Sequence, residues 1–373
     1  MEPITQALLG AATAELVAGR RLGRRALGWG AVVGMSPDLD VVLAPLHDGF
    51  GEWLYHRGTT HSLWFGFVVG PLLGWGLWRW RDPGSHTPVG AWIALCTVAL
   101  FTHPLLDGFT PYGTQLLAPF SRMRFAWNGV AIVDPFYSIL LGAGVAAVAT
   151  RRLSDRVRRG VLVASLVLST GYLGVGLALN RWVLDDLRRV LVAQDFEASR
   201  VRAYPTVLQP WLRGFVAHTQ DGIVVGLHSL TDPGCPSWRV HPVPARTGVV
   251  ATVLSSWEGR LLEWFADGDV GVFVSPSDYG TRVRVEDLRY AWSTPDGRGA
   301  WAIEAELSGP GRLVGRIRRT ERPPLEPGAL DRFAALLAGR LPGRDAGWIR
   351  PAGCGGGRDV AAAPRRPVPA ALD

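Results

Sequence analysis

Lysine is absent from this 373-residue chain, so all 39 basic residues are arginines, and they outnumber 32 acidic residues to give a net charge of +7. A basic chain can bind nucleic acid, or it can follow the positive-inside rule of membrane proteins. The arginines gather beside hydrophobic segments. This pattern favours a membrane protein and argues against nucleic acid as a partner.

Cysteine is scarce and scattered, at Cys96, Cys235 and Cys354. This spacing predicts neither a disulfide framework nor a zinc site built from thiolates. The extreme N-terminus also lacks a basic region, and Glu2 and Gln6 precede the first apolar run. We therefore expect no cleavable signal peptide, so the first apolar run should remain in the mature protein.

Charged residues are rare in the first half of the chain, where apolar residues form long runs. Several runs approach the roughly 20 residues that an α-helix needs to cross a bilayer. The run at 26–35 is too short to cross alone. We expect about six hydrophobic helices in an integral membrane domain at residues 1–180, with runs at 4–19, 26–35, 63–80, 89–101, 130–149 and 160–179.

Three arginine clusters separate these runs and set the expected orientation. If the clusters face the cytoplasm, the helices alternate in direction and the polar motifs fall near outward-facing ends. We therefore expect a multi-pass protein of the cell (inner) membrane whose C-terminal domain lies outside the cytoplasm. The clusters are Arg20, Arg21, Arg24 and Arg25, then Arg79 and Arg81, then Arg151, Arg152, Arg156, Arg158 and Arg159.

The pattern changes after residue 180. A connecting helix is expected at 181–200, followed by a β-rich extramembrane domain at 201–320 with strands at 222–227, 248–254, 271–274, 282–285 and 301–307. Residues 321–373 should hold a short helix at 330–341 and a disordered tail from residue 351. The expected fold class is a mainly α integral membrane helical bundle followed by a small β-rich soluble domain.

Histidine and aspartate recur beside three of the hydrophobic segments. His103 and Asp107 are four residues apart, which places them on one face of a helix, one turn apart. The stretches SPDLD and HRGTTHS have the same character. Three histidines and three aspartates without a thiolate suit Zn²⁺ best, with Mn²⁺ or Fe²⁺ as other candidates. Six ligands exceed one tetrahedral shell, so they are enough for two ions bridged by a carboxylate. The predicted metal ligands are Asp38, Asp40, His56, His61, His103 and Asp107.

Each motif also has a simpler interpretation. The aspartates of SPDLD can cap a helix, the histidines of HRGTTHS can lie on an exposed loop, and His103 with Asp107 can be a structural pair between helices. Arg57 and Arg122 can neutralise a phosphate-like group, or they can pair with an aspartate and with lipid head groups. Asp134 starts a helix and is a candidate to support a ligand. No ligand pattern is present at His47, Asp48, His218, His228 and His241.

The motifs SPDLD, HRGTTHS and THPLLDGFTPYGTQLLAPFS, in this order among hydrophobic helices, resemble the YdjM-like family of predicted membrane-bound metal-dependent hydrolases. The resemblance covers about residues 1–140 and implies that the six ligands above occupy the family's metal-binding positions. The family often carries histidine where this chain has Gln6, whose amide oxygen is a poorer ligand. Its distant similarity to zinc-dependent phospholipase C implies phosphoester chemistry.

Two functions are consistent with these residues. In the first, a membrane-bound metal-dependent hydrolase uses metal-activated water on a phosphoester or lipid-linked substrate, with Asp107 and Arg57 acting in catalysis and membrane lipid as a partner. In the second, a non-catalytic envelope membrane protein holds a structural metal or ion-pair cluster, and its β-rich domain binds a partner. A catalytic site keeps an open coordination position, whereas a structural site is closed.

Overall fold

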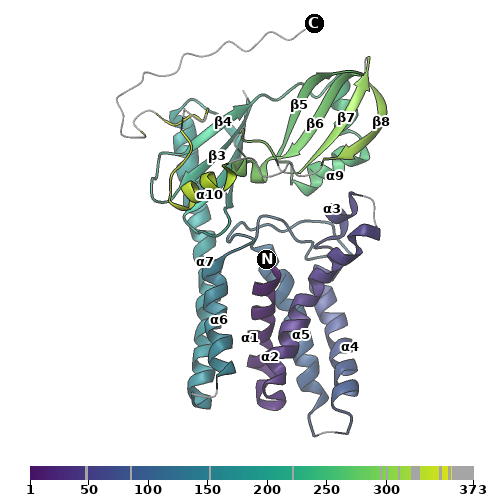
Figure 1. Ribbon diagram of the computed structural model, residues 1–373, viewed down its shortest axis with the longest axis vertical. Helices are drawn as coiled ribbons and strands as arrows, with labels where there is room; N and C mark the ends of the chain where they lie inside the picture. The colour runs from purple at the N-terminus through teal and green to yellow at the C-terminus, as the bar shows by residue number, and fades with distance from the viewer. Residues whose placement is uncertain are drawn as a thin grey trace.

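The computed structural model has a bundle of helices at one end and a β-rich domain at the other (Figure 1). The chain builds the bundle first and the β-rich domain second, in the predicted order. The structure describes residues 1–46, 49–84, 86–150, 153–220, 222–294, 296–299, 301–309, 311–320, 328–343, 347–351 and 354.

Side-chain caps begin several of the bundle helices. Ser62, Asp134 and Ser154 each accept a backbone N–H of the first turn of the helix that follows. The bundle contains α1 (Pro3–Leu22), α2 (Arg25–Met35), α4 (Leu63–Arg81), α5 (Val89–Gly108), α6 (Pro135–Ala149) and α7 (Asp155–Ala193). Between α2 and α4, at the end nearest the β-rich domain, lie the 3₁₀ helix η1 (Ser36–Leu46), α3 (Gly51–Tyr55) and η2 (Thr59–His61).

The prediction of about six membrane-spanning helices is wrong. Within the described residues, two helices are long and apolar enough to cross a membrane, α5 and α7. The 11 residues of α2 and the 15 of α6 fall short of the roughly 20 that a span needs. Glu15, Arg20 and Arg21 lower the hydropathy of α1, and glycine, tryptophan and two terminal arginines lower that of α4.

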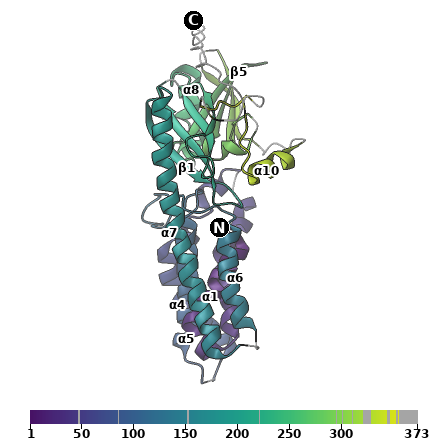
Figure 2. The ribbon, with the colours of Figure 1, turned by 90° about the vertical axis from the view of Figure 1, so that its left-hand side faces the viewer.

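Helix α7 is continuous over 39 residues. It leaves the bundle and runs on beside the β-rich domain (Figure 2). The predicted separation into a membrane helix and a connecting helix is therefore absent from this described segment. Val183, Leu187 and Leu191 lie one turn apart on one face and are buried in a core that includes side chains of β1, β2 and β3. This face attaches the β-rich domain to the end of α7.

The β-rich domain contains two four-stranded antiparallel sheets, each with its strands in sequence order. Neighbouring strands in the chain are therefore neighbours in the sheet, as in a meander. The first sheet holds β1 (Ala198–Pro205), β2 (Leu212–Thr219), β3 (Ile223–Ser229) and β4 (Ser237–His241), and the second holds β5 (Val270–Ser277), β6 (Gly280–Asp287), β7 (Ala302–Ser308) and β8 (Arg312–Arg319). The accompanying helices are α8 (Gly248–Leu254), α9 (Trp257–Phe265), η3 (Leu288–Ser293) and α10 (Ala329–Leu337).

The segment 248–254, predicted as a strand, forms helix α8 instead. Its valines favour a strand by composition, but its buried residues are Val250, Val253 and Leu254. That spacing is helical and does not alternate as a strand would. The strands predicted at 222–227, 271–274, 282–285 and 301–307 lie largely within β3, β5, β6 and β7, and the helix predicted at 330–341 is α10.

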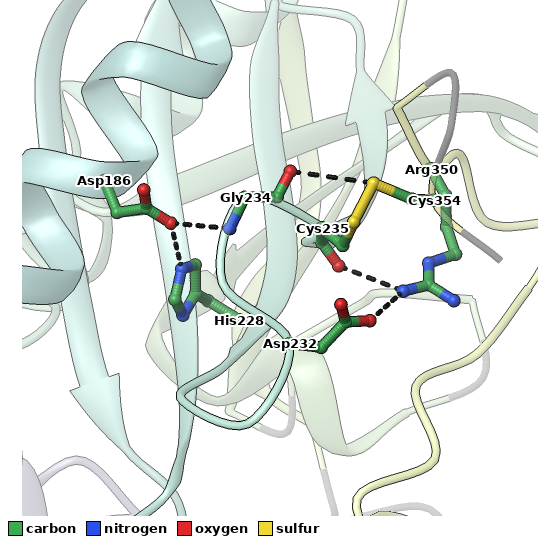
Figure 3. Close-up of a disulfide and its surroundings, with 7 residues drawn as sticks. All are labelled: Asp186, His228, Asp232, Gly234, Cys235, Arg350 and Cys354. Atoms are coloured by element: carbon green, nitrogen blue, oxygen red, sulfur yellow. Dashed lines mark hydrogen bonds and ion pairs between the residues drawn. A yellow bond between two sulfur atoms is a disulfide. The ribbon is translucent and has the colours of Figure 1, made fainter.

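Cys235 and Cys354 form a disulfide (Figure 3), so the prediction of no disulfide framework is wrong. The two cysteines are 119 residues apart, and their spacing carries no pairing signal. Trp238 and Ile349 bring them together by exchanging backbone hydrogen bonds of 2.9 and 2.7 Å. The start of the predicted disordered tail is therefore fixed to β4, and residues 355–373 lie outside the described residues.

The arginine clusters lie at the end of the bundle that is farthest from the β-rich domain (Figure 1). Arg25 at the start of α2 pairs with Asp82 after α4 at 2.6 Å. Its neighbour Arg24 donates to the carbonyl of Ala149 at the end of α6. These contacts place the ends of three helices together. Two predicted members, Arg151 and Arg152, lie outside the described residues.

The second sheet and α9 pack on the opposite end of the bundle, next to α3. Trp53 of α3 stacks on Phe265 of α9 with ring centroids 5.3 Å apart. Arg319 of β8 donates to Glu52 of α3 at 2.8 Å. The β-rich domain therefore covers the segments between α2 and α4, where four of the six predicted metal ligands lie.

The packing of α1 on α2 depends on glycine. A Cβ at Gly10 would lie 2.7 Å from the Cα of Gly34, whereas a Cβ at Gly28 would meet nothing within 4 Å. We expect Gly10→Ala to lower the thermal unfolding midpoint of the purified protein, because overpacking costs roughly 1–3 kcal/mol. Gly28→Ala is the control and should be neutral or stabilise α2 by roughly 0.5–1 kcal/mol. Equal midpoints for the two variants would contradict this packing.

Candidate metal centre

Four side chains converge at the bundle end beneath the β-rich domain. Asp38 comes from η1, His61 from η2, and His103 and Asp107 from one face of α5. Each offers a ligand atom, and these atoms lie within 4.8 Å of one another. His61, His103 and Asp107 are buried. The structure therefore brings together residues from all three motifs, and we call these four residues the cluster.

The distances within the cluster suit a single ion. Nε2 of His61 lies 3.2 Å from Asp38 Oδ1 and 3.5 Å from Asp107 Oδ2. Nε2 of His103 lies 3.6 Å from each of the same two oxygens. Tetrahedral bonds of roughly 2.0–2.1 Å place neighbouring ligand atoms about 3.3 Å apart. Four nitrogen and oxygen donors at these separations can hold a divalent ion with little movement.

A backbone carbonyl fixes the ring of His103. Its Nδ1 donates to the carbonyl oxygen of Gly34 at 2.6 Å. Its buried Nε2 has no hydrogen-bond partner among the described residues. A histidine that binds a metal through one nitrogen usually donates its other N–H to a carbonyl or carboxylate. His103 therefore has the tautomer and the environment of a metal ligand.

A hydrogen-bond chain fixes the ring of His61 in the same way. Thr60 Oγ1 donates to Asp40 Oδ2 at 2.9 Å, so the hydroxyl oxygen accepts the N–H of His61 Nδ1 at 3.0 Å. Burial lowers the pKa of His61, but hydrogen bonds to Asp38 and Asp40 outweigh burial and raise it. Nε2 of His61 remains next to the oxygens of the cluster.

Asp40 and His56, also predicted as ligands, lie beside the cluster and contact each other. His56 Nδ1 donates to Asp40 Oδ1 at 2.7 Å, and the backbone N–H of Arg57 donates to Asp40 Oδ2 at 3.3 Å. Burial opposes ionisation of Asp40, but hydrogen bonds from His56 and His61 hold its pKa well below the usual range. Asp40 therefore orients His61, and the role of Asp40 and His56 as ligands stays a prediction.

Asp107 uses both carboxylate oxygens. Its Oδ1 accepts from Gln6 Nε2 at 3.0 Å and from the amino group of Met1. Its Oδ2 lies 3.4 Å from Nε of Arg57. Gln6 thus reaches the centre from α1, and its buried Oε1 has no hydrogen-bond partner among the described residues. In this arrangement Gln6 holds the carboxylate of Asp107 in place by donating its amide N–H.

Arg57 lies against the cluster in a strained backbone conformation. Its φ of 59° is in the left-handed region, which costs a non-glycine residue of order 1 kcal/mol or more. The side chain donates from Nη1 to Thr110 Oγ1 at 2.9 Å. Its guanidinium carbon lies 4.7 Å from the centroid of the Tyr112 ring. These contacts fix a cation next to Asp107.

The residues that hold Arg57 in place carry little signal in the sequence. Thr110 and Tyr112 belong to the stretch TPYG, which is typical of a turn and lies within the third motif, but nothing in it indicates a contact with Arg57. Arg289 of η3 donates to two carbonyls of this stretch at 3.0 Å each, and Asp287 holds its guanidinium at 2.7 Å. No motif identifies an arginine that lies 177 residues after Tyr112. The β-rich domain therefore supports the site.

The remaining sequence candidates lie away from the cluster. Asp134 caps α6, where its Oδ1 accepts the N–H of Tyr137 at 3.1 Å. Arg122 is exposed, and its carbonyl accepts from Trp264 at 3.0 Å. Hydrogen bonds to Asp269, Asp186 and Gly297 hold His218, His228 and His241. His47 and Asp48 lie outside the described residues.

A family model described as YdjM inner membrane protein matches residues 1–183. These residues include every member of the cluster and most of the bundle. Over this region, just under half of the chain, the protein matches the YdjM inner membrane protein family. The family predicted from the motifs is therefore confirmed, and its description assigns it to the inner membrane.

Two curated relatives are similar to the chain. The inner membrane protein YbcI of Escherichia coli (strain K12) is 39% identical over 116 residues, which are 30% of this chain and 64% of YbcI. The uncharacterized protein YfhP of Bacillus subtilis (strain 168) is 25% identical over 232 residues, which are 59% of this chain and 66% of YfhP. The chain thus spans just under two thirds of the length of each relative. No solved structure matches the chain.

Removing one ligand tests the metal centre. His61 and His228 are both 0% exposed and both pair with an aspartate, but His228 lies in the β-rich domain. We expect His61→Ala to lose most bound divalent metal in elemental analysis. Its thermal unfolding midpoint should fall as well, because an ion that binds only the folded protein stabilises it. His228→Ala should keep its metal. Equal metal content in wild type and His61→Ala would rule the cluster out as the binding site.

Proposed function

We propose that this protein is a membrane-bound, metal-dependent hydrolase that cleaves a phosphoester or another lipid-linked bond. One observation carries the proposal. His103 donates from Nδ1 to the Gly34 carbonyl, while its buried Nε2 lies near two carboxylates without a hydrogen bond in the described structure. A buried histidine with a purely structural role would be expected to pair both nitrogens. A metal ligand keeps one of them free.

Zinc is the proposed ion. Two imidazoles and two carboxylates without a thiolate suit Zn²⁺, and Mn²⁺ or Fe²⁺ accept the same donors. A divalent ion in this position would lower the pKa of a bound water towards neutrality and so supply a nucleophile. The carboxylates of Asp38 and Asp107 balance the two charges of such an ion.

The side chains around the cluster provide orientation and charge. Arg57 contacts Asp107 through Nε, which places its guanidinium beside the cluster, where it would bind an anionic phosphoryl oxygen. Nδ1 of His56 is engaged by Asp40, so its Nε2 is available to exchange a proton with a substrate. Thr110 and the Tyr112 ring hold Arg57 in position during these steps.

Membrane lipid is the proposed environment and the proposed source of substrate. Large apolar side chains are exposed on α4, α6 and α7, as expected of helices that contact lipid. Exposed apolar residues continue onto η1, which carries Asp38, so a lipid-linked substrate has an apolar route to the cluster. These residues include Phe67, Leu72, Ile139, Val167 and Val175 on the helices, and Leu39 and Val42 on η1.

The proposed orientation places the β-rich domain outside the cytoplasm, and two independent observations support it. The arginine clusters lie at the bundle end opposite the β-rich domain (Figure 1), and arginine is enriched on the cytoplasmic side of membrane proteins. The Cys235–Cys354 disulfide lies in the β-rich domain (Figure 3), and disulfides persist in oxidising compartments.

A second candidate function is a non-catalytic envelope protein in which the metal is structural and the β-rich domain binds a partner. One observation favours it. The β-rich domain packs directly over the loops of the site, where Tyr112 shares a core with Phe265 and Val270. A closed site is typical of structural metals.

Asp107→Asn tests hydrolysis. The change keeps the shape of a fully buried side chain and removes the charge that both Arg57 and a cation require. In a screen of phosphodiesters and phospholipids, we expect turnover to fall at least roughly 10- to 100-fold, because losing even a group that supports a metal ligand has an effect of this size. Asp134→Asn is the control and should keep activity, because asparagine also caps a helix. If Asp107→Asn retains activity, or if metal-loaded wild type is inactive throughout, the structural role becomes the better account.

Thiol labelling tests the orientation. Cys235→Ser breaks the disulfide and leaves Cys354 with a free thiol, while Cys96 is buried. In spheroplasts, we expect a membrane-impermeant maleimide to label Cys235→Ser and to leave wild type unlabelled. Labelling of Cys235→Ser only after lysis would place the β-rich domain in the cytoplasm.

A further inference from the structure

The ring of Tyr112 joins the metal centre to the β-rich domain. It contacts the ring of His56 at a centroid distance of 5.5 Å and the ring of Phe265 in α9 at 5.3 Å. Guanidinium carbons lie near the same ring, at 4.7 Å for Arg57 and 5.4 Å for Arg124. Two cations from different parts of the chain therefore meet at one aromatic ring.

Positive charge exceeds negative charge around this ring. Arg57 contacts Asp107 at 3.4 Å, and Arg289, which donates to the Tyr112 carbonyl, pairs with Asp287 at 2.7 Å. Arg124 makes no ion pair with a carboxylate in the part of the chain that the structure describes. A buried cation without a counter-charge is costly.

Aromatic rings and carbonyls hold Arg124 in place instead. Its guanidinium carbon lies 4.9 Å from the ring centroids of both Trp264 and Phe265, and Nη2 donates to the Gly113 carbonyl at 3.0 Å. Nη2 also donates to the Tyr112 carbonyl. Nη1 is buried and has no hydrogen-bond partner in the described structure.

Two further buried groups at this ring lack a hydrogen-bond partner in the described structure. The Tyr112 hydroxyl makes no hydrogen bond to any described residue, and Nε of Arg57 has only its ion pair with Asp107 Oδ2 at 3.4 Å. Tyr112 and Arg57 are 7% and 4% exposed. An unsatisfied buried donor destabilises the folded protein, and more so when it is charged. The Tyr112 hydroxyl and Nη1 of Arg124 are donors without an acceptor in the described structure, so the missing partner is an acceptor. An acceptor that serves a hydroxyl and a guanidinium, next to a second guanidinium, is best an anion with several oxygens.

We propose that Arg124, Tyr112 and Arg57 form a phosphate-binding subsite next to the cluster. The inference rests on the proposed function, because the phosphate is that of a phosphoester substrate. Trp264 and Phe265 of α9 hold Arg124, so the subsite is complete only when the β-rich domain is packed on the bundle. The β-rich domain thereby contributes to substrate binding.

Local electrostatics support the subsite. Burial and the charge of Arg289 lower the pKa of Arg124 to about 10, so its cationic form is disfavoured relative to an exposed arginine. A bound anion offsets this cost. Burial also raises the pKa of Tyr112, which keeps its hydroxyl protonated as a donor.

Phosphate binding to the purified full-length protein tests the subsite. The protein is kept metal-free with a chelator, so that an ion in the cluster cannot bind the phosphate. At equal ionic strength, inorganic phosphate should raise the thermal unfolding midpoint of wild type more than chloride does. Absence of this phosphate-specific shift in wild type would overturn the proposal.

Three variants locate the binding. Tyr112→Phe removes only the unpartnered hydroxyl, and Arg124→Gln removes the unpaired cation. Each should weaken phosphate binding about tenfold or more, the value of a hydrogen bond that involves a charged group. Arg122→Gln is the control, because Arg122 is exposed two residues away, and it should bind phosphate as wild type does. An equal phosphate response in wild type, Tyr112→Phe and Arg124→Gln would overturn the subsite.

Effects of the variants on folding and on hydrolysis can be distinguished from their effect on phosphate binding. Tyr112→Phe deletes a hydroxyl that makes no hydrogen bond in the described structure, so without phosphate it should be at least as stable as wild type. Phosphate binding that is intact when no substrate is hydrolysed would overturn the proposed function alone. Hydrolysis that persists after wild type fails to bind phosphate would overturn the subsite alone.

A lipid head group and a soluble phosphoester present the same phosphate oxygens. Phe120 and Met123, just before Arg124, are 76% and 58% exposed and offer apolar contacts to an acyl chain. Dihexanoyl phosphatidate and glycerol phosphate, compared in the same assay, separate the two sources. Tighter phosphatidate binding assigns a lipid, and equal binding assigns a soluble ligand. Either result supports the subsite, and binding of neither contradicts it.

Discussion

The hydrogen bond from His103 to the carbonyl of Gly34 determines the geometry of the site. It links α5 to the end of α2, where Gly34 lies too close to Gly10 of α1 for a side chain to fit between them. The bond fixes which nitrogen of His103 carries its proton, and the other nitrogen then completes the cluster. The glycines that let α1 and α2 pack closely thereby determine which nitrogen of His103 on α5 carries the proton.

Buried charge links the two parts of the molecule. Asp107 needs a cation, and Arg57 provides one from a strained backbone position. The Tyr112 ring stacks on Arg57, and Arg289 of the β-rich domain holds the Tyr112 backbone. A charge in the bundle is thus positioned by residues far along the chain. The β-rich domain therefore supports the site directly. A domain that only binds a separate partner would not need these contacts.

Much of the site could be predicted because its chemistry lies in local motifs, such as the spacing of His103 and Asp107. The sequence could not show which hydrophobic runs cross the membrane, or which residues far apart in the chain meet in the fold. Charge-poor runs look alike whether they cross a membrane or stop within a bundle, so six spans were expected where the described chain has two. A valine-rich stretch formed α8 because its burial is helical. Cys354 and Arg124 meet Cys235 and Tyr112 only in the folded chain, and no spacing in the sequence indicates these contacts.

The central claim is that the cluster holds one divalent ion through Nε2 of both histidines. Anomalous X-ray diffraction at the absorption edge of the metal found in the purified protein tests it most directly. The account predicts one anomalous peak about 2 Å from Nε2 of His61 and of His103, with oxygens of Asp38 and Asp107 completing its contacts. Metal-replete crystals with no peak at these four side chains, or with the ion bound elsewhere, would contradict the account.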